Sequence, residues 1–513
     1  DAMHVSAVVG QEVTWRGAQA LRTLAQKLGH NAQLDLVSVP ASVQAQLRPY
    51  QQDGLNWLQF LGQHGFGGIL ADDMGLGKTL QTLVHIQIEK DAGRLTTPAL
   101  IIVPVSVLGN WQREASKFCP QLRTLIVHGK ERHEAASNLS DLDVVIAPYS
   151  LLQRDRERWL ATTWHIVVLD EAQNIKNSNT LAAQVVKELK AHQRLCLSGT
   201  PIENHLGEMW SLFHFLMPGF LGSQKRFGEI FRNPIEKQNN AGRLKSLRSR
   251  ITPFMLRRTK AQVAGDLPPK IETTARIELS GKQADLYETI RLTTEKAVRD
   301  ALATQGFSKS RVTILDALLK LRQVCCDPRL VPSPAAKKIN QSAKLAHLMD
   351  ILPNMLAEGR RVLLFSQFTS MLTLIEAELA KRNLKWTKLT GSSQHRDTIV
   401  ERFTSGEVPL FLISLKAGGV GLNLPQADTV IHYDPWWNPA VENQATDRAH
   451  RIGQTQKVWV IKLVAQGTIE ERILVMQERK ADLAESLYSD AVARKQPLFS
   501  EQDLADLLKP LGS

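Results

Sequence analysis

Short apolar runs rich in β-branched residues recur in both halves of this chain, separated by amphipathic segments of helical length. Near-continuous apolar strands that alternate with helices are typical of parallel sheets buried on both faces. Two such arrays predict an α/β protein with two doubly wound parallel-sheet domains. The predicted strands of the first half are Gly68–Ala71, Ala99–Val103, Thr124–His128, Val144–Ala147, Ile166–Leu169 and Leu195–Ser198. Those of the second half are Val362–Phe365, Trp386–Leu389, Leu410–Ser414, Val430–Tyr433 and Val458–Leu463.

The region between the two arrays is predicted to be mostly helical, for example at Lys282–Ala303 and Val312–Val324. Several prolines interrupt it, and the Asp266–Lys270 segment with its proline pair is the best candidate for a linker. The predicted lobes are residues 45–265, with a helical insertion at about 205–260, and residues 266–485, with a helical protrusion at about 279–330. Residues 1–44 are expected to be an N-terminal helical extension, and residues 486–513 a C-terminal tail.

The length of the chain indicates more than one domain, and its charge indicates the class of partner. A chain of 513 residues is too long for one core. Its 63 Lys and Arg against 51 Asp and Glu give a formal charge of +12, which favours polyanions. The basic run Arg243–Lys260 contains no acidic residue and is either a solvated helix face or a polyanion contact. No run of about 18 apolar residues occurs, so no membrane span is expected.

Cysteine usage indicates a reducing compartment. None of the four cysteines forms a C-x-x-C pair, and Cys325 and Cys326 are adjacent, which suits neither a shared metal nor a bridge. A reduced cytoplasmic protein without structural zinc is therefore expected.

A phosphate-binding loop follows the first predicted strand. The segment Asp72-Asp73-Met74-Gly75-Leu76-Gly77-Lys78-Thr79 leads into an amphipathic helix. Gly75 and Gly77 would let backbone N–H groups turn towards phosphate oxygens at the positive end of that helix. Lys78 would reach the β- and γ-phosphates, and the Thr79 hydroxyl would bind Mg²⁺. The first Gly of the general motif is replaced by Asp72.

A carboxylate pair ends a later strand of the first half. Strand Ile166–Leu169 is followed by Asp170 and Glu171, at the strand end where parallel sheets bind ligands. Asp170 would hold Mg²⁺, and Glu171 would orient and deprotonate the attacking water. The segment Ser198–Pro201 ends another strand and is either a sensor of the phosphate state or a plain turn.

The second half carries a helix start after Asp434-Pro435-Trp436-Trp437. Asn438 is predicted as its N-cap, Pro439 as its first residue, and Gly453 as the residue past its end. On one helix, Gln444, Arg448 and Arg451 would share a face. Two arginines aimed at a γ-phosphate would be arginine fingers; a solvent-facing basic stripe is the alternative.

A second Gly-rich loop, Ser414–Gly421, follows another strand of the second half. It lacks the G-K-[ST] sequence, so a second ATP site is not expected. Close approach to a phosphate backbone, or to a nucleotide, suits it better.

Together these segments resemble the Swi/Snf (Snf-two) family of helicase-like ATPases in helicase superfamily two. The matching segments are Leu47 to Gln51, Asp72 to Thr79, Asp170 to Gln173, Leu197 to Pro201, Ser414 to Leu424 and Asp434 to Gln454. The resemblance implies two RecA-like lobes that bind ATP and Mg²⁺ and step along double-stranded DNA, generally without separating its strands. Ala172-Gln173 and Lys416 depart from the eukaryotic form and resemble bacterial members.

The resemblance also implies site residues. Gln51 should recognise the adenine, Asp72 belongs to the family's own loop motif, and Arg448 and Arg451 should complete the ATP site. The nucleotide contacts are predicted at Gln51, Asp72, Asp73, Met74, Gly75, Leu76, Gly77, Lys78, Thr79 and Gln444. The candidate DNA contacts are Gln367, Ser414, Lys416 and Trp437. The basic run Arg243–Lys260 is then expected near DNA or the linker.

Three other activities remain open: a strand-separating helicase, a DNA clamp switched by ATP, and a factor that recycles RNA polymerase. The expected partners are double-stranded DNA and, beyond it, DNA-bound proteins or RNA polymerase. The expected state is a monomer that is nucleoid-associated in a bacterial cytoplasm, or nuclear in a eukaryote.

Overall fold

A computed structural model describes residues 34–128, 139–178, 180–199, 206–238, 240–263, 265, 267–418, 422–451, 453–486, 507–508 and 510–511. The chain divides into two compact units, here called unit 1 (main segment up to Gly265) and unit 2 (main segment Asp266–Leu483). Of the helices described, none is both long and apolar enough to cross a membrane. All four cysteines are buried with free thiols.

Unit 1 is built on a parallel sheet with the strand order β3-β4-β2-β5-β6-β1-β7. Its strands are β1 (Gly68–Leu70), β2 (Ala99–Val103), β3 (Thr124–Ile126), β4 (Val144–Pro148), β5 (Thr163–Asp170), β6 (Lys190–Leu197) and β7 (Met255–Leu256). Every strand predicted in this half is confirmed. The central strands β2 and β4 are buried at every residue because helices cover both faces of the sheet.

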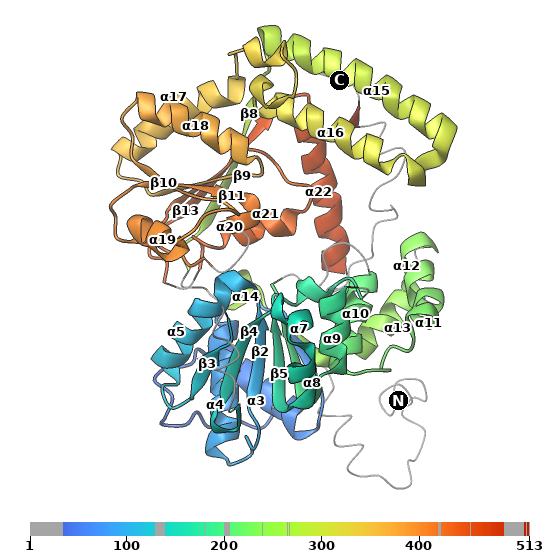
Figure 1. Cartoon of the computed structure of the whole chain (residues 1–513), viewed down its shortest axis with the longest axis vertical. Coiled ribbons are helices and arrows are strands. Elements are labelled where there is room, and N and C mark those ends of the chain that lie inside the picture. The colour runs from blue at the N-terminus through green and yellow to red at the C-terminus, as the bar shows by residue number, and fades with distance from the viewer. Residues whose placement is uncertain are drawn as a thin grey trace. The chain divides into compact units, whose positions relative to one another are not determined.

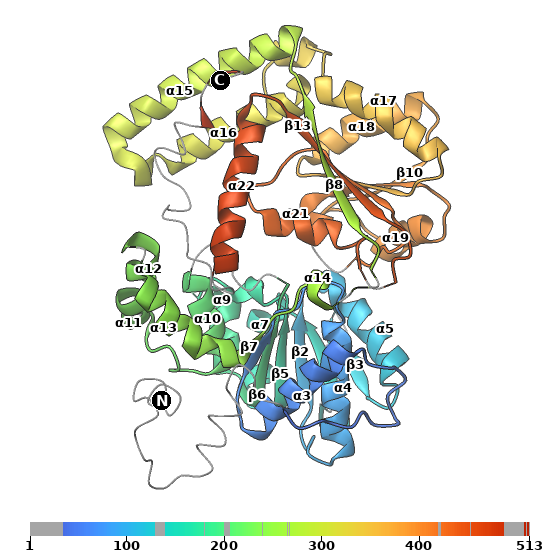
Figure 2. The ribbon, with the colours of Figure 1, turned by 180° about the vertical axis from the view of Figure 1, so that it is seen from behind.

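Helices cover the sheet of unit 1 from both sides. Figure 2 shows α3 and α4 in front of the sheet, and Figure 1, the opposite view, shows α7, α8 and α9 in front of it. The α-helices are α3 (Pro49–Gln63), α4 (Lys78–Asp91), α5 (Leu108–Phe118), α7 (Leu151–Arg154), α8 (Arg156–Ala161), α9 (Leu181–Glu188), α10 (Leu206–Leu216), α11 (Gln224–Phe227), α12 (Asn233–Gln238), α13 (Ala241–Ile251) and α14 (Lys260–Val263).

Two features of unit 1 differ from the prediction. Strand β7 was not predicted, because its two residues are too few to show the alternation of apolar and polar residues that marks a strand. It pairs with Ile69 and Leu70 of β1. The predicted N-terminal helical extension, 1–44, is wrong over its described part, since residues 34–44 contain no helix. That segment is held on unit 1 by other bonds, such as Val37 N to Asn56 Oδ1 at 2.9 Å. The rest of the extension lies outside the described residues.

Unit 2 contains a second parallel sheet, with the order β10-β11-β9-β12-β13-β8. Its strands are β8 (Lys270–Ile277), β9 (Val362–Ser366), β10 (Trp386–Leu389), β11 (Leu410–Ser414), β12 (Thr429–His432) and β13 (Val458–Ala465). The five strands predicted in this half are confirmed. Alternate residues of β9 enter different cores: Val362 and Leu364 pack on one face, and Leu363 and Phe365 on the other.

Strand β8 was missed because it is an edge strand with charged and threonine residues on its exposed positions. It pairs along its whole length with β13, and it begins at Lys270, the last residue of the predicted linker. Only Ile277 of this strand is buried, so the apolar run that marks a central strand is absent.

The helical protrusion of unit 2 is a pair of helices, α15 (Gly281–Lys309) and α16 (Arg311–Cys326), which lie side by side (Figures 1 and 2). Their shared core includes Tyr287, Leu321 and Ile473 of α22. The other α-helices of unit 2 are α17 (Ala343–Ala357), α18 (Thr369–Lys381), α19 (Arg396–Thr404), α20 (Leu415–Gly418), α21 (Pro439–Thr446) and α22 (Ile469–Ser486). Of the predicted C-terminal tail, 486–513, the described residues are Ser486, where α22 ends, and 507–508 and 510–511; Leu507 and Leu508 pack into this core.

The helix that starts at Asn438 is shorter than predicted. Its start is confirmed, since the Asn438 side chain caps it by accepting from Ala440 N at 3.1 Å and Pro439 is its first residue. Its predicted length is wrong, because α21 ends at Thr446 and the chain tightens into turns in which Ala449 N donates to Thr446 O. Gly453 has φ of +101°, but it lies beyond these turns rather than directly past the helix.

Candidate functional site

The functional candidates of unit 1 gather at one edge of its sheet. Strands β5, β6 and β1 are neighbours, and each ends on a candidate segment: Asp170, Ser198 and the loop that starts at Asp72. All three strands are parallel, so their carboxyl ends meet at the same edge. Ligands of open α/β sheets bind at this edge.

The phosphate loop has the backbone that its glycines predict. Gly75 and Gly77 adopt φ of +84° and +80°, in the left-handed region that residues with a Cβ rarely occupy. Gly77 caps the N-terminus of α4, which starts at Lys78, so Lys78 and Thr79 lie in its first turn. The Lys78 ammonium donates to the carbonyl oxygens of Asp72 at 2.5 Å and Asp73 at 3.2 Å. The loop therefore presents a helix N-terminus and a cation together.

The carboxylate of Asp72 is fully buried and forms an ion pair with Arg258. Arg258 follows β7, 186 residues later in the chain; its Nε donates to Asp72 Oδ1 at 2.9 Å and its Nη2 contacts Oδ2. The guanidinium also donates to the Tyr50 carbonyl and to Gln81 Oε1, and lies 5.3 Å from the Tyr50 ring centroid. Any contact of Asp72 with a nucleotide must therefore come from its backbone.

The N-terminus of α3 packs on the same loop. The Tyr50 hydroxyl donates to Leu76 O at 3.0 Å, and Gln51 Nε2 donates to the same oxygen at 3.2 Å. Gln51 is 4% exposed, and its Oε1 accepts from Arg48 N. Asp73 is held by the segment after β7, because its N–H donates to Arg258 O and its Oδ2 accepts from Lys260 N. Met74, the remaining loop residue, lies against Gly199.

Asp170, the last residue of β5, is fixed by side chains from two other elements. Trp111 Nε1 of α5 donates to Asp170 Oδ2 at 2.8 Å, and the Tyr149 hydroxyl donates to Asp170 O at 2.9 Å. Burial, together with the neighbouring charge of Glu171, raises the pKa of Asp170 to about 6, although Trp111 and Lys78 oppose the shift. The influence of Lys78 indicates that the two predicted residues are close enough to interact.

Glu171 adopts a left-handed conformation, with φ of +49°, which is strained for a residue with a side chain. Its carboxylate Oε2 accepts from Gln173 Nε2 at 2.8 Å, and Gln173 Oε1 accepts from the Ser198 hydroxyl at 3.1 Å. Gln173 thus connects the predicted catalytic carboxylate to the end of β6. Thr200 and Pro201, the rest of that predicted segment, lie outside the described residues.

The DNA-contact candidates of unit 2 gather at the carboxyl edge of the second sheet. Strands β11, β9 and β12 are neighbours, and Ser414 pairs in register with Ser366. Asp434, after β12, accepts from the Ser366 hydroxyl at 2.6 Å and from Gln367 N at 3.3 Å. The carboxylate thereby joins the end of β9 to the end of β12.

The candidates at this edge differ in exposure. Ser414 is buried and accepts from Ala417 N, whereas Lys416 is exposed on α20. Gln367 and Trp437 are half-buried. Gly419–Gly421, the glycines of the second loop, lie outside the described residues.

Gln444 and the two predicted arginine fingers do not lie on one helix. Gln444 is in α21 and is 8% exposed, while Arg448 and Arg451 lie in the turns after it. The prediction of a shared helical face is therefore wrong, because the helix ends two residues before Arg448. The Arg448 side chain is 2% exposed, and its Nη1 donates to Leu422 O at 3.3 Å.

Several residues at these edges were missed from the sequence. Tyr149 directly follows strand β4, so its place at the carboxyl edge of the sheet could have been predicted from the sequence. Trp111 lies in the middle of α5 and carried no such signal. Arg258 and Arg322 were each one residue in a basic or amphipathic stretch, and only the folded chain pairs them with Asp72 and Asp434.

Comparison with known proteins gives two family matches. A family model described as SNF2-related domain matches residues 50–330, and one described as helicase conserved C-terminal domain matches residues 343–453. A Bacillus subtilis (strain 168) protein named as an ATP-dependent helicase/translocase, YwqA, is 42% identical over 95% of this chain and 53% of its own length. The ISWI chromatin-remodeling complex ATPase ISW1 of Saccharomyces cerevisiae is 35% identical over 86% of this chain and 41% of its own length. The chain thus spans about half, or less, of these relatives.

Among solved structures, the chain is similar to the Sulfolobus solfataricus SWI2/SNF2 ATPase core in complex with double-stranded DNA. The identity is 38%, the similarity covers 93% of this chain and 99% of that one, and the TM-score is 0.46.

Proposed function

This chain belongs to the SNF2-related family of helicase-like ATPases, and from that premise we propose that it couples ATP hydrolysis to movement along double-stranded DNA. The observation that carries the proposal is the edge of unit 1. There a glycine loop, the Lys78 ammonium and the carboxylate of Asp170 converge at one edge of a parallel sheet. That arrangement suits binding and hydrolysis of a nucleoside triphosphate.

Mg²⁺ fits the carboxylates of unit 1. Burial beside Glu171 raises the pKa of Asp170, and a divalent cation would relieve this concentration of negative charge. Thr79 and Asp170 would hold the ion, which supplies neutralisation of phosphate charge when bound. Lys78 would turn from the loop carbonyls to the β- and γ-phosphates, and Gln51 would contact the adenine.

Glu171 is proposed to orient the attacking water and accept its proton. Its bond to Gln173, and from there to Ser198, supports a path by which the nucleotide state reaches β6. Arg448 and Arg451 are proposed as arginine fingers, which are worth about 10³–10⁵ in rate in other NTPases.

Double-stranded DNA is proposed as the track, with Gln367, Ser414, Lys416 and Trp437 as its contacts. A formal charge of +12 supports a polyanionic partner, and the relative named as a translocase supports movement. Of the four, Lys416 is exposed, Gln367 and Trp437 are half-buried, and Ser414 is buried. Remodelling of protein–DNA complexes by a monomer, in the nucleoid or nucleus, is part of the same proposal.

The deciding experiment measures the ATPase rate of the chain with no nucleic acid, single-stranded DNA, duplex DNA and RNA. Duplex DNA should stimulate most, and Lys78→Ala and Glu171→Gln should each lower the stimulated rate by about 100-fold or more. Stimulation by single strands or RNA alone contradicts the proposal.

Displacement of a triplex-forming strand then separates movement from simple switching. A translocase displaces the third strand at a rate that follows ATP hydrolysis, whereas an ATP-switched clamp hydrolyses ATP and leaves the triplex intact. Release of a fluorescent strand from a duplex would instead indicate a strand-separating helicase. Recycling of RNA polymerase needs a surface that none of these motifs supplies.

A further inference from the structure

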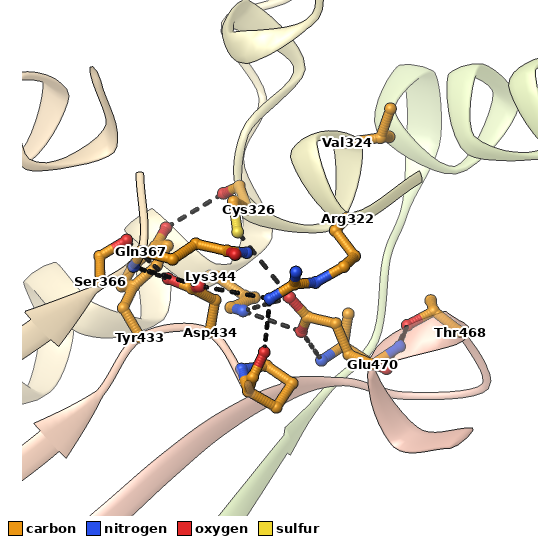
Figure 3. A network of polar contacts seen from close by, with 12 residues as sticks. Arg322, Val324, Cys326, Lys344, Ser366, Gln367, Tyr433, Asp434, Thr468 and Glu470 are labelled. Carbon is orange, nitrogen blue, oxygen red and sulfur yellow. Dashed lines mark hydrogen bonds and ion pairs between the residues drawn. The ribbon is translucent and has the colours of Figure 1, made fainter. Parts of the chain in front are cut away.

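Arg322 of the helical protrusion reaches the edge of the second sheet where the DNA-contact candidates lie (Figure 3). Its side chain is buried, with 3% of the residue exposed. Nη2 donates to the Pro435 carbonyl at 2.6 Å and lies 3.8 Å from Asp434 Oδ2. The helix α16 is thereby connected to the segment Asp434–Trp437, 113 residues further along the chain.

Aromatic rings surround the guanidinium of Arg322. Its central carbon lies 5.4 Å from the ring centroids of both Trp436 and Trp437 and 6.0 Å from that of Phe368. A planar guanidinium stacks on aromatic faces while it donates hydrogen bonds in its own plane, which an ammonium does not do. An ammonium can also lie over a ring, as that of Lys344 does 4.9 Å from the Tyr433 ring centroid, but it lacks the planar fork of donors.

The backbone of the same segment is held from other helices as well. Trp436 N donates to Glu442 of α21 at 2.6 Å, and the Trp436 carbonyl accepts from Gln477 of α22. Arg322 adds the Pro435 carbonyl, from α16. Three helices thus fix two consecutive residues that lie directly before Trp437, a candidate DNA contact.

Asp434 extends this control to the other candidate. The carboxylate that lies near Arg322 also accepts from Gln367 N and from the Ser366 hydroxyl (Figure 3). The buried guanidinium of Arg322 therefore lies near the Trp437 ring and bonds to the backbone two residues before it. Through Asp434 it is also linked to the backbone N–H of Gln367. Burial raises the pKa of Asp434, so keeping this carboxylate in the core is energetically costly.

A neighbouring buried ion pair joins two other helices of unit 2 and does not involve Arg322. Lys344 of α17 and Glu470 of α22 are both 0% exposed and bond at 2.8 and 2.9 Å. Glu470 also accepts from Ala465 N and from Cys326 Sγ, at the end of α16. The protrusion is thus already anchored to the sheet without Arg322.

We propose that Arg322 is a positioning residue for duplex DNA: it holds Asp434–Trp437 and the end of β9 in one arrangement, so that Gln367 and Trp437 contact DNA together. This inference rests on the proposed function. It also makes the helical protrusion part of the DNA-contacting apparatus, because the side chain that sets the two contacts is supplied by α16.

The test compares Arg322→Gln and Arg322→Lys with the wild-type chain, by ATPase titrations with duplex DNA and with ATP. We expect Arg322→Gln to raise the half-saturating duplex concentration about tenfold, the loss of one charge-assisted bond, while the KM for ATP stays within about twofold. Arg322→Lys keeps the charge but not the planar fork of donors, and we expect a rise of about threefold.

Arg329→Gln is the matched control. Arg329 pairs with Asp327 just after α16, with two bonds of 2.8 Å, and among the described residues no hydrogen bond or ion pair joins it to the Asp434–Trp437 segment. Both of its kinetic constants should stay within about twofold of wild type.

Two results would overturn the inference: a half-saturating duplex concentration within twofold of wild type, or an equal rise in the KM for ATP. If Arg322→Gln does not fold, Arg322→Lys is judged by the same two criteria. Failure of duplex DNA to stimulate the wild-type chain overturns the proposed function and this inference together. Stimulation of the wild type with unchanged Arg322 variants overturns this inference alone.

Discussion

Each unit buries an aspartate two residues after a parallel strand and brings a distant arginine to it. In unit 1, Asp72 follows β1 and Arg258 makes close contacts with both carboxylate oxygens. In unit 2, Asp434 follows β12, and Arg322 lies 3.8 Å away while Ser366 and Gln367 supply the hydrogen bonds. Both arginines also bond to a backbone carbonyl and lie over aromatic rings.

The difference between these two pairs is in what each charge does. Arg258 neutralises Asp72 directly, so the pair behaves as one rigid part of the phosphate loop. Asp434 is shared between a hydroxyl, a backbone N–H and a more distant guanidinium, so it joins three segments. We therefore expect loss of the Arg258–Asp72 pair to lower the free energy of unfolding more than loss of the Arg322–Asp434 pair. Loss of the Arg322–Asp434 pair should mainly change the position of the segments that Asp434 joins.

Arg258→Met is expected to give the largest loss. It leaves the fully buried carboxylate of Asp72 without its ion pair, which costs about 3–5 kcal/mol of unfolding free energy. Urea denaturation, followed by hydrogen exchange of peptides from unit 1, measures it. Arg156→Met breaks an exposed pair with Glu188 in the same unit and should cost at most about 1 kcal/mol. Equal losses in the two variants would contradict the expectation that the buried Arg258–Asp72 pair contributes more to stability than an exposed pair.

Asp72→Asn and Asp434→Asn compare the two aspartates directly. The first leaves a buried guanidinium facing an amide and should cost about 3 kcal/mol. The second should cost about 1 kcal/mol, because burial already raises the pKa of Asp434 and an amide oxygen can still accept from Ser366. The same denaturation measurement applies, and a larger loss for Asp434→Asn would reverse the comparison.

A buried neutral histidine in each unit predicts acid sensitivity. Burial lowers the pKa of His432 to about 3, and it also lowers the pKa of His85, which bonds to Gln59 and Gln193. Below about pH 6.5 the histidines of the unfolded chain take up protons that those of the folded chain do not. The free energy of unfolding therefore decreases as the pH is lowered.

For His432 the loss from pH 6.5 to pH 5 should approach about 2 kcal/mol, at about 1.4 kcal/mol per pH unit. Denaturation at several pH values measures this slope, and His432→Gln should flatten it. A steeper slope in His432→Gln would be inconsistent with a neutral buried ring.

Ser366→Ala should have the smallest effect. It removes the bond of 2.6 Å to Asp434 and a longer one of 3.2 Å from Phe368 N, and it leaves the other partners of Asp434, so about 1 kcal/mol is expected from denaturation of unit 2. Ser405→Ala, whose hydroxyl bonds to the Arg402 carbonyl at an exposed position, should change stability by less than about 0.5 kcal/mol. A loss at position 366 no larger than at 405 would mean that Asp434 does not depend on this hydroxyl.

Much of this architecture could be predicted locally. Strands such as β2 and β4 are apolar at each residue because both faces are covered, and that pattern is visible in any short window of sequence. The turn at Gly75 and Gly77 follows from the conformational freedom of glycine. Asp170 and Glu171 could be assigned to a functional edge because they end a parallel strand.

Other features had no local signal. Edge strand β8 is mostly exposed and therefore lacks the apolar run of a central strand. The end of α21 at Thr446 depends on tertiary bonds, among them Leu424 N to Arg448 O and Gln454 Nε2 to the Ala427 carbonyl. A helix pattern that continues in sequence can be stopped by such contacts.

The sequence by itself determined two parallel α/β units, a phosphate loop and a carboxylate pair, because each rests on residues that are neighbours in the chain. Only the tertiary structure decided which arginines serve the two buried aspartates. Arg258 lies 186 residues from Asp72, and Arg322 lies 113 residues from Pro435. A basic residue in a helix or loop is expected to face solvent when only the sequence is known. Folding removes water from around these two arginines, and that loss of water makes a partner charge necessary.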